Sequence, residues 1–333
     1  MVSPLIALLR RPYERRANAR LLPIDGPGAV CEAGFVRIGG IEQWVTVRGH
    51  DRANPPLLLL HGGPGAPFTP FNPRLRPWEE RFTVVQWDQR GGGRTFIHAG
   101  DHQPDLSLEL LVTDAIELAE VVHTRFGQQI LLVGSSLGSL IGAIVASRRP
   151  DLFSAFVAAN LFAADSAAEG WRAVRAHAVA SGDVRGVAEL DALGPDPREW
   201  TPGQAEDVNK RAIKATPEVP DMVYDLILPA LMYDPTLSLS DIGAINRGMQ
   251  RSLATLQPEY SRFDFDALGW AYEIPYVVVH GAADLISPVV AARRHWERIV
   301  APDKAFIEVE GAGHLVEFVD VERFRDELEK AAA

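Results

Sequence analysis

The chain has 333 residues, 47% of them hydrophobic and 23% charged, a balance typical of a folded globular protein and not of a disordered one. The formal net charge of −11 argues against a basic footprint for gripping nucleic acid, which excludes a nucleic-acid partner. The single cysteine, Cys31, cannot form an internal disulfide, and this favours a reducing, cytoplasmic setting.

The first 30 residues form a predicted N-terminal helical extension. An apolar run over residues 4–9 precedes a group of basic residues: Arg10, Arg11, Arg15, Arg16 and Arg20. A secretory signal carries its charge before the apolar run, and a membrane span needs roughly 20 apolar residues, so the segment fits neither. We expect a short amphipathic helix that packs on the domain or on a second copy in a homo-oligomer. Attachment to a membrane surface is a minor alternative.

The next part of the chain alternates strands with helices. Residues 35–38 and 41–47 alternate apolar and polar side chains around a Gly-Gly turn, which predicts an antiparallel hairpin. Continuous apolar runs, typical of parallel strands buried on both faces, follow at 57–60, 82–87, 130–133, 153–158, 276–279 and 305–309. Helical patterns lie between them at 107–125, 137–149, 288–300 and 321–330. This order predicts an α/β fold, a mostly parallel central sheet with helices on both faces.

The alternation stops over residues 161–270, where helical stretches are broken by several prolines and no parallel strand is evident. Roughly 110 residues are too many for a loop between two strands of one sheet. We therefore expect this segment to fold as a helical cap, or lid, subdomain on a core formed by residues 31–160 and 271–333.

The sharpest motif is Gly134-Ser135-Ser136-Leu137-Gly138, which follows an apolar strand and opens a helix. Small residues two before and two after a serine permit the tight, strained turn of a nucleophile elbow, which would expose Ser136 above the sheet. The alternative is an ordinary helix start with Ser135 or Ser136 as the N-cap.

A serine hydroxyl needs a base to take its proton and a carboxylate to orient that base. Where the nucleophile sits on such an elbow, acid and histidine follow it in that order, at strand ends. Asp284 and His314 fit these places. Alternatives are a helix-capping role for Asp284, a packing role for His314, and other candidates for the acid or the base: Glu310, Asp303, His280 and His295.

A second motif, His61-Gly62-Gly63-Pro64-Gly65, follows an early strand. Backbone amides fixed beside the serine stabilise the negative charge that develops on a carbonyl oxygen during acyl transfer. We expect the amides of Gly63 and Leu137 to form this oxyanion hole, with Gly62 in place of Gly63 as the fallback. The alternative is a bare Gly-Pro turn.

These motifs, with Asp88-Gln-Arg90-Gly-Gly-Gly-Arg-Thr95 after the next strand, make the chain similar to the proline iminopeptidase family of α/β-hydrolases. The likeness begins near residue 35. It implies an α/β-hydrolase fold with a helical cap, an acyl-enzyme on Ser136, and no metal or cofactor. It also implies that Asp88 and Arg90 support the oxyanion loop, although an Arg–Asp pair that organises the glycine turn explains them equally well.

The resemblance also suggests how a substrate would bind, since cap carboxylates in the family hold the free ammonium group of the substrate. The cap offers these carboxylates: Glu169, Glu189, Glu199, Glu206 and Glu218. An apolar pocket could be lined by Trp171, Trp200, Tyr224 and Tyr233, which core packing of the cap explains as well. A metal site in the loop with His98, Asp101, His102 and Asp105 is set aside, because a solvated loop accounts for these residues.

The sequence thus predicts a serine hydrolase that acts on a small molecule or short peptide, first of all a proline iminopeptidase-like aminopeptidase. Two departures from the family pattern, Leu137 where a Trp is usual and Ala282-Ala283 where Arg-Tyr is usual, favour the alternative of an esterase, lactonase or amidase. A non-catalytic ligand-binding protein on the same fold is the third option. Epoxide hydrolases and dehalogenases carry Asp at the elbow, where this chain has Ser136.

Overall fold

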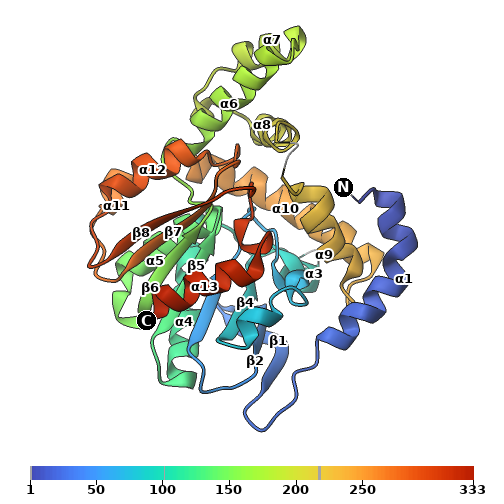
Figure 1. Cartoon of the computed structure of the whole chain (residues 1–333), viewed down its shortest axis with the longest axis vertical. Helices are drawn as coiled ribbons and strands as arrows, with labels where there is room; N and C mark the ends of the chain where they lie inside the picture. The colour runs from blue at the N-terminus through green and yellow to red at the C-terminus, as the bar shows by residue number, and fades with distance from the viewer. Residues whose placement is uncertain (1, 101, 217–218) are drawn as a thin grey trace.

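One eight-stranded sheet runs through the molecule in the order β1-β2-β4-β3-β5-β6-β7-β8 (Figure 1). The structure is a computed structural model that describes residues 2–100, 102–216 and 219–333. The strands are β1 (Val30–Ile38), β2 (Ile41–Gly49), β3 (Pro56–Leu60), β4 (Thr83–Asp88), β5 (Ile130–Ser135), β6 (Phe153–Ala159), β7 (Tyr276–Gly281) and β8 (Lys304–Val309).

The strand directions confirm the predicted α/β class. β1 and β2 form the antiparallel hairpin at one edge and β2 pairs antiparallel with β4, whereas all pairs from β4 to β8 are parallel. Side chains of β3 alternate between two cores: Leu58 and Leu60 lie on one face, Leu57 and Leu59 on the other. Both faces are covered, which explains why the strand sequences read as continuous apolar runs.

Helices cover the two faces. On one face α4 (Leu108–Phe126), α5 (Leu137–Arg148) and α12 (Val289–Arg298) contribute to the larger core, and on the other face α2 (Arg76–Glu79) and α13 (Val321–Ala332) contribute to the second. Shorter elements complete these layers: η1 (Thr69–Phe71), α3 (Gly93–Ala99), η2 (Pro150–Leu152) and η5 (Val316–Phe318).

Between β6 and β7 the chain forms a series of helices, called here the inserted helices. They are α6 (Ser166–Ala180), α7 (Val184–Leu193), η3 (Pro197–Glu199), α8 (Pro202–Lys214), the π-helical turn η4 (Met222–Ile227), α9 (Leu228–Tyr233), α10 (Leu239–Tyr260) and α11 (Phe265–Leu268). Figure 1 shows α6, α7 and α8 rising above the sheet. These three helices share a small core of their own, around Trp171 and Trp200.

The N-terminal helix α1 (Pro4–Leu21) begins after Ser3, whose hydroxyl accepts a hydrogen bond from the amide of Ile6. It lies beside α9, with Ala7 buried against Met232 and Tyr233. Among the helices of the described residues, none is both long and apolar enough to cross a bilayer.

Arg90 and Asp114 form a buried ion pair beneath the glycine turn that follows β4. Nε and Nη2 of the guanidinium donate to the two carboxylate oxygens, at 2.8 and 3.1 Å; Nη2 also donates to the Gly39 carbonyl, and Nη1 donates to the Asp105 carbonyl. The two side chains are 4% and 0% exposed. The pair therefore ties α4 to the hairpin and to the turn after β4.

We expect Asp114→Ala to lower the free energy of unfolding by about 3–5 kcal/mol, because it leaves the Arg90 charge buried without a partner. Urea denaturation of the purified variant measures this change. Glu32→Ala is the matched control, since it removes the exposed pair between Glu32 and Arg125, whose loss changes stability by about 1 kcal/mol or less. Equal losses in the two variants would contradict a structural role for the buried pair.

Candidate active site

The register of the parallel strands gathers the loops that follow β3 to β8 at one edge of the sheet. Leu60 at the end of β3 pairs with Gly134 of β5, which places the loop that begins at His61 beside Ser136. On the other side, β6 and β8 flank β7, with Gly281 paired to Val309. The loops that carry Asp284 and His314 therefore also lie side by side.

Ser136 occupies a sharp turn between β5 and α5. Its φ of 53° and ψ of −124° are unusual for a residue with a side chain. A Cβ on Gly138 would meet the Leu60 carbonyl oxygen at 2.2 Å, and one on Gly134 would meet the Gly138 carbonyl oxygen at 2.4 Å. Both glycines are thus required for the turn. The Ser136 hydroxyl makes no capping bond to α5, which leaves it available to a ligand.

Asp284 follows β7 and is 2% exposed. One carboxylate oxygen accepts from the amides of Ile286 and Ser287, at 2.8 and 3.0 Å. The other accepts from His314 Nδ1 at 2.8 Å and from Asn160 Nδ2 at 2.6 Å. Burial raises the pKa of Asp284, but the positive charge on His314 and the hydrogen bond from His314 lower it by more than burial raises it. The pKa therefore lies below its ordinary value, and the carboxyl stays ionised.

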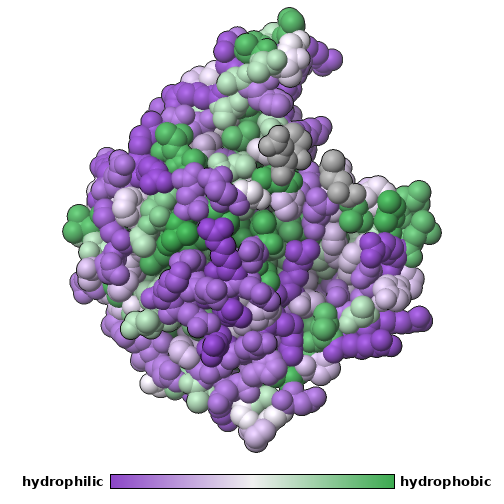
Figure 2. Space-filling view, in the orientation of Figure 1, coloured by the Kyte–Doolittle hydropathy of each residue, from purple (hydrophilic) through white to green (hydrophobic). Residues whose placement is uncertain are grey.

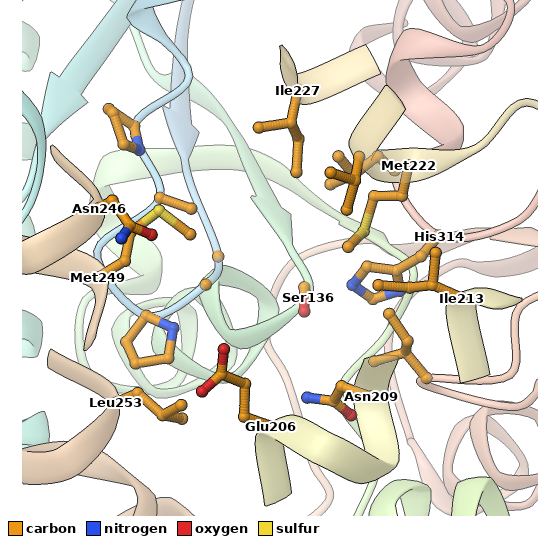
Figure 3. A pocket seen from close by; sticks show the side chains of 18 of the residues that line it. Ser136, Glu206, Asn209, Ile213, Met222, Ile227, Asn246, Met249, Leu253 and His314 are labelled. Carbon is orange, nitrogen blue, oxygen red and sulfur yellow. The ribbon is translucent and has the colours of Figure 1, made fainter. Parts of the chain in front are cut away.

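His314 presents its imidazole between this carboxylate and Ser136. Burial lowers the pKa of His314, but the charge of Asp284 and the hydrogen bond to it outweigh the burial, and the pKa lies above its ordinary value. Because Nδ1 is bonded to Asp284, Nε2 is the ring nitrogen left for proton transfer. In Figure 3 the ring extends toward Ser136.

The other candidates for acid and base do not take the bond between His314 and Asp284, although His280 Nε2 lies 3.8 Å from the Asp284 carboxylate. Asp303 and Glu310 are exposed, and the hydrogen bond of His314 goes to Asp284. His280 is fully buried, accepts from the Leu161 amide and has its other nitrogen 2.6 Å from the Ser287 carbonyl oxygen. His295 packs against Phe265 and Trp270, and burial lowers its pKa to about 4.

The glycine loop after β3 lies against the elbow. A Cβ on Gly62 would be 2.8 Å from the Ser136 Cβ and 3.3 Å from the Leu137 amide nitrogen. Gly63 lines the same cavity as Ser136. His61 braces the loop: Nε2 accepts from the Gln89 amide at 3.1 Å, so the protonated Nδ1 donates to the Gly62 carbonyl at 2.9 Å. Burial lowers the pKa of His61 to about 4 and keeps the ring neutral.

Asp88 and Arg90 do not pair with each other. Asp88 accepts from the Thr69 hydroxyl and the Arg94 amide, both at 2.8 Å, and burial raises its pKa to about 6. Arg90 instead pairs with Asp114. Each side chain shapes the turn after β4, which lies next to the glycine loop through the bonds between Gln89 and His61.

A cavity of about 270 Å³ opens above Ser136 and His314 (Figure 3). Its wall is largely apolar and comes from the glycine loop and from α8, η4, α9 and α10. The apolar side chains include Phe68, Ile213, Met222, Ile227, Leu231, Met249 and Leu253. Glu206 and Asn209 extend from α8 into the cavity, and Lys210 pairs with Glu206 at 2.9 Å. A smaller cavity of about 80 Å³ touches Ser136 from another side.

The sequence candidates for substrate binding occupy several places. Glu206 is the one cap carboxylate of that group on the wall of the larger cavity, and Trp200 lines the smaller one. Glu169 pairs with Arg172 and Arg294, and Glu189 with Arg185 and Arg211. Four others lie away from both cavity walls: Trp171 in the core of the inserted helices, Tyr233 under α1, and the more exposed Glu199 and Tyr224. Glu218 lies outside the described residues.

Two residues of the site, Asn160 and Glu317, are not part of any motif in the sequence. Asn160, after β6, donates to Asp284 and to the Gly313 carbonyl, and accepts from the Val316 amide at 2.8 Å. Glu317, fully buried, accepts from the Ser135 hydroxyl at 2.5 Å. Asn160 thus holds the acid and histidine loops together, and Glu317 joins the histidine loop to the elbow. Asn160 directly follows strand β6, and Glu317 lies three residues after His314. These two positions in the sequence were the only indications that the residues could belong to the site.

Across residues 2–100, 102–216 and 219–333, no group of three or more His, Cys, Asp or Glu side chains is placed to hold a metal ion. His98 lies 2.9 Å from Glu42 and packs against Phe35. Asp101, one of the four loop residues considered from the sequence, is outside the described residues.

A family model described as "alpha/beta hydrolase fold" matches residues 55–321, and the chain belongs to this family of hydrolases. It is 24% identical over 306 residues to the "Probable aminopeptidase YbaC" of Bacillus subtilis, with 89% of this chain and 94% of the relative covered. It is also 24% identical over 278 residues to "3-oxoadipate enol-lactonase 2" of Acinetobacter baylyi, covering 84% and 89%.

Among solved structures, the "proline iminopeptidase-related protein" of Thermus thermophilus superposes with a TM-score of 0.59 at 23% identity, covering 91% of this chain and 97% of that one. The fold and the resemblance to the proline iminopeptidase family, predicted from the motifs, are confirmed.

The raised pKa of His314 predicts the pH dependence of any hydrolysis that uses this ring as a base. Because the base must be neutral, kcat/KM falls as the pH drops through that pKa, with a midpoint above 6.5. Asp284→Asn removes the charge that raises the pKa while burial still lowers it. We expect the midpoint to move to lower pH and kcat to fall about 10³–10⁴-fold.

Rates measured from about pH 5 to pH 9 on a soluble aryl ester test this expectation. Asp303→Asn, in an exposed carboxylate, is the control and should leave both the midpoint and kcat unchanged. A larger effect of Asp303→Asn than of Asp284→Asn would show that the orienting acid is a different one.

Proposed function

We propose that the chain is a serine hydrolase in which Ser136 is the nucleophile, His314 the general base and Asp284 the acid that orients it. The observation that carries the proposal is the 2.8 Å bond from His314 Nδ1 to Asp284, with His314 and Ser136 on the wall of one cavity. Nε2 of His314 takes the Ser136 proton as the oxygen attacks an acyl carbon. It then gives that proton to the leaving group.

The amides of Gly63 and Leu137 serve as the oxyanion hole in this proposal, with Gly62 in place of Gly63 as the fallback. Their support is the close approach of the glycine loop to the elbow and the start of α5 at Leu137, where the helix directs free amides at its N-terminal end. Water, activated by the same imidazole, then cleaves the acyl-enzyme. The inserted helices act as the cap that encloses the substrate, since α8, η4, α9 and α10 form much of the cavity wall.

Ser136→Ala should lower kcat at least about 10³-fold, because no other group can form the acyl-enzyme. The parent enzyme should also gain the mass of an aryl phosphonate on the peptide that contains Ser136, as measured by mass spectrometry. Ser181→Ala, in an exposed serine, is the control. Full activity of Ser136→Ala, or labelling of another residue in the parent, would contradict the proposal.

For the substrate we favour an N-terminal amino acyl group, as in an aminopeptidase of the proline iminopeptidase type. The Glu206 carboxylate extends from α8 into the largely apolar cavity whose wall also carries Ser136 (Figure 3). A carboxylate in that place can bind the ammonium group of a substrate whose small apolar side chain packs against the wall. The full-length similarity to a relative named as an aminopeptidase supports this choice.

A second candidate is the hydrolysis of a small carboxylic ester, lactone or amide. Glu206 already pairs with Lys210, which balances the one carboxylate that the described residues place on the cavity wall, and the remaining wall suits an uncharged acyl chain. The similarity to a relative named as an enol-lactonase is compatible with this reading.

A substrate series separates the two candidates. An aminopeptidase should cleave a prolyl arylamide rapidly and its N-acetylated form at least about tenfold more slowly, because acetylation removes the ammonium group. Glu206→Gln should raise KM for the free amine about 10–100-fold and leave turnover of a short-chain aryl ester unchanged. Rapid ester cleavage without turnover of the prolyl amide would select the second candidate. Glu199→Gln, in a carboxylate off the cavity wall, is the matched control.

A further inference from the structure

The N-terminal helix α1 is oriented with its polar face inward. Ala7 is fully buried against α9, and the residues that follow it on the same face use polar side chains to hold the helix. Arg11 donates to the Leu237 carbonyl at 2.7 Å, and Asn18 donates to the Tyr233 carbonyl at 3.1 Å. Arg15 donates to two carbonyls of the same segment, at 3.0 and 2.6 Å.

The opposite face of α1 exposes large apolar side chains. Leu5, Leu9 and Tyr13 follow one another at intervals of four, and they are 67%, 73% and 73% exposed. Ile6 and Leu8 beside them are 46% and 47% exposed. Figure 2 shows this hydrophobic group at the right-hand margin, over the beginning of α1. A water-soluble helix normally buries such a stripe, so its exposure here indicates a surface that another phase or molecule covers.

The positive charge on α1 indicates what kind of surface covers the stripe. The stripe continues into Arg16 and Arg20, both exposed, and the described residues offer neither of them an ion-pair partner. With five arginines and one glutamate α1 carries +4, so the remainder of the −11 chain carries −15. The helix is therefore a local positive region on a strongly negative molecule.

We infer that α1 is an interfacial helix that docks this protein on an anionic phospholipid surface. Leu5, Leu9 and Tyr13 enter the boundary between headgroups and acyl chains, while Arg16 and Arg20 bind lipid phosphates. A second copy fits less well, because its own stripe carries the same two arginines and no acidic residue that they could bind. The −15 remainder would be repelled by the bilayer, which orients the molecule with α1 toward the lipid.

This inference does not depend on the proposed function, and vesicle sedimentation of the full chain tests it. The protein is mixed with vesicles of phosphatidylcholine alone or with about one third phosphatidylglycerol, at low and high salt. We expect binding to the anionic vesicles that high salt weakens. Leu5→Ser with Leu9→Ser should lower the partition constant at least about tenfold. Arg16→Gln with Arg20→Gln should lower it on anionic vesicles only.

The control is Val184→Ser with Val300→Ser, in two valines that are 81% and 66% exposed on other parts of the surface. It should bind vesicles like the parent. Hydrolysis of a soluble ester and the circular dichroism spectrum should be the same for all variants, which separates lost docking from lost folding.

Three results would overturn the inference. The first is a parent protein that sediments with neither kind of vesicle, and the second is equal binding to neutral and anionic vesicles. The third is a dimer, detected by light scattering, that Leu5→Ser with Leu9→Ser dissociates while no vesicle binding occurs. The stripe would then be a contact between two copies.

Discussion

The carboxylate of Asp284 is the charge around which the whole edge of the sheet is arranged. A buried carboxylate is strongly unfavourable unless donors surround it. Four donors do so here: two amides of its own loop, the Asn160 side chain and His314. They come from the loops after β6, β7 and β8, so satisfying this one charge fixes three loops relative to one another. The position of the imidazole beside Ser136 follows from that arrangement.

A second buried carboxyl, that of Glu317, lies near the same imidazole but has different surroundings. It receives one hydrogen bond, from Ser135, and its other oxygen has no partner among the described residues. Burial raises the pKa of Glu317, whereas the pKa of Asp284 is lowered. The two carboxyls thus differ in their tendency to carry charge because the charge and hydrogen bond of His314 outweigh burial at Asp284, whereas burial dominates at Glu317. Asp284 is the one equipped to balance a protonated imidazole, and Glu317 is equipped to hold the elbow against the histidine loop.

Much of this arrangement could be predicted from the sequence, because it depends on local patterns. The apolar run of β3, the glycines around Ser136 and the order of serine, acid and histidine each report a backbone geometry that few residues permit. Asn160 and Glu317 could not be found this way, since their partners are 124 and 182 residues distant in the sequence. The residues of the cavity wall could not be predicted from local sequence patterns either. The wall depends on how α8, η4 and α10 pack, and Trp171 and Tyr233, which the sequence offered for that wall, instead pack elsewhere, in the core of α6 to α8 and against α1.

The helix α9 links the interior cavity to the outer surface of the molecule. Leu231 lies on the cavity wall, whereas the neighbouring Met232 and Tyr233 pack against Ala7 of α1. The hydrogen bonds from Arg11, Arg15 and Asn18 go to backbone carbonyls at the end of α9 and in the turn after it. These bonds hold the position of a segment too short to be stable alone. The outer face of α1 and the cavity above Ser136 are therefore separated by the same short element, which contacts α1 through Met232 and Tyr233 and closes one side of the cavity through Leu231.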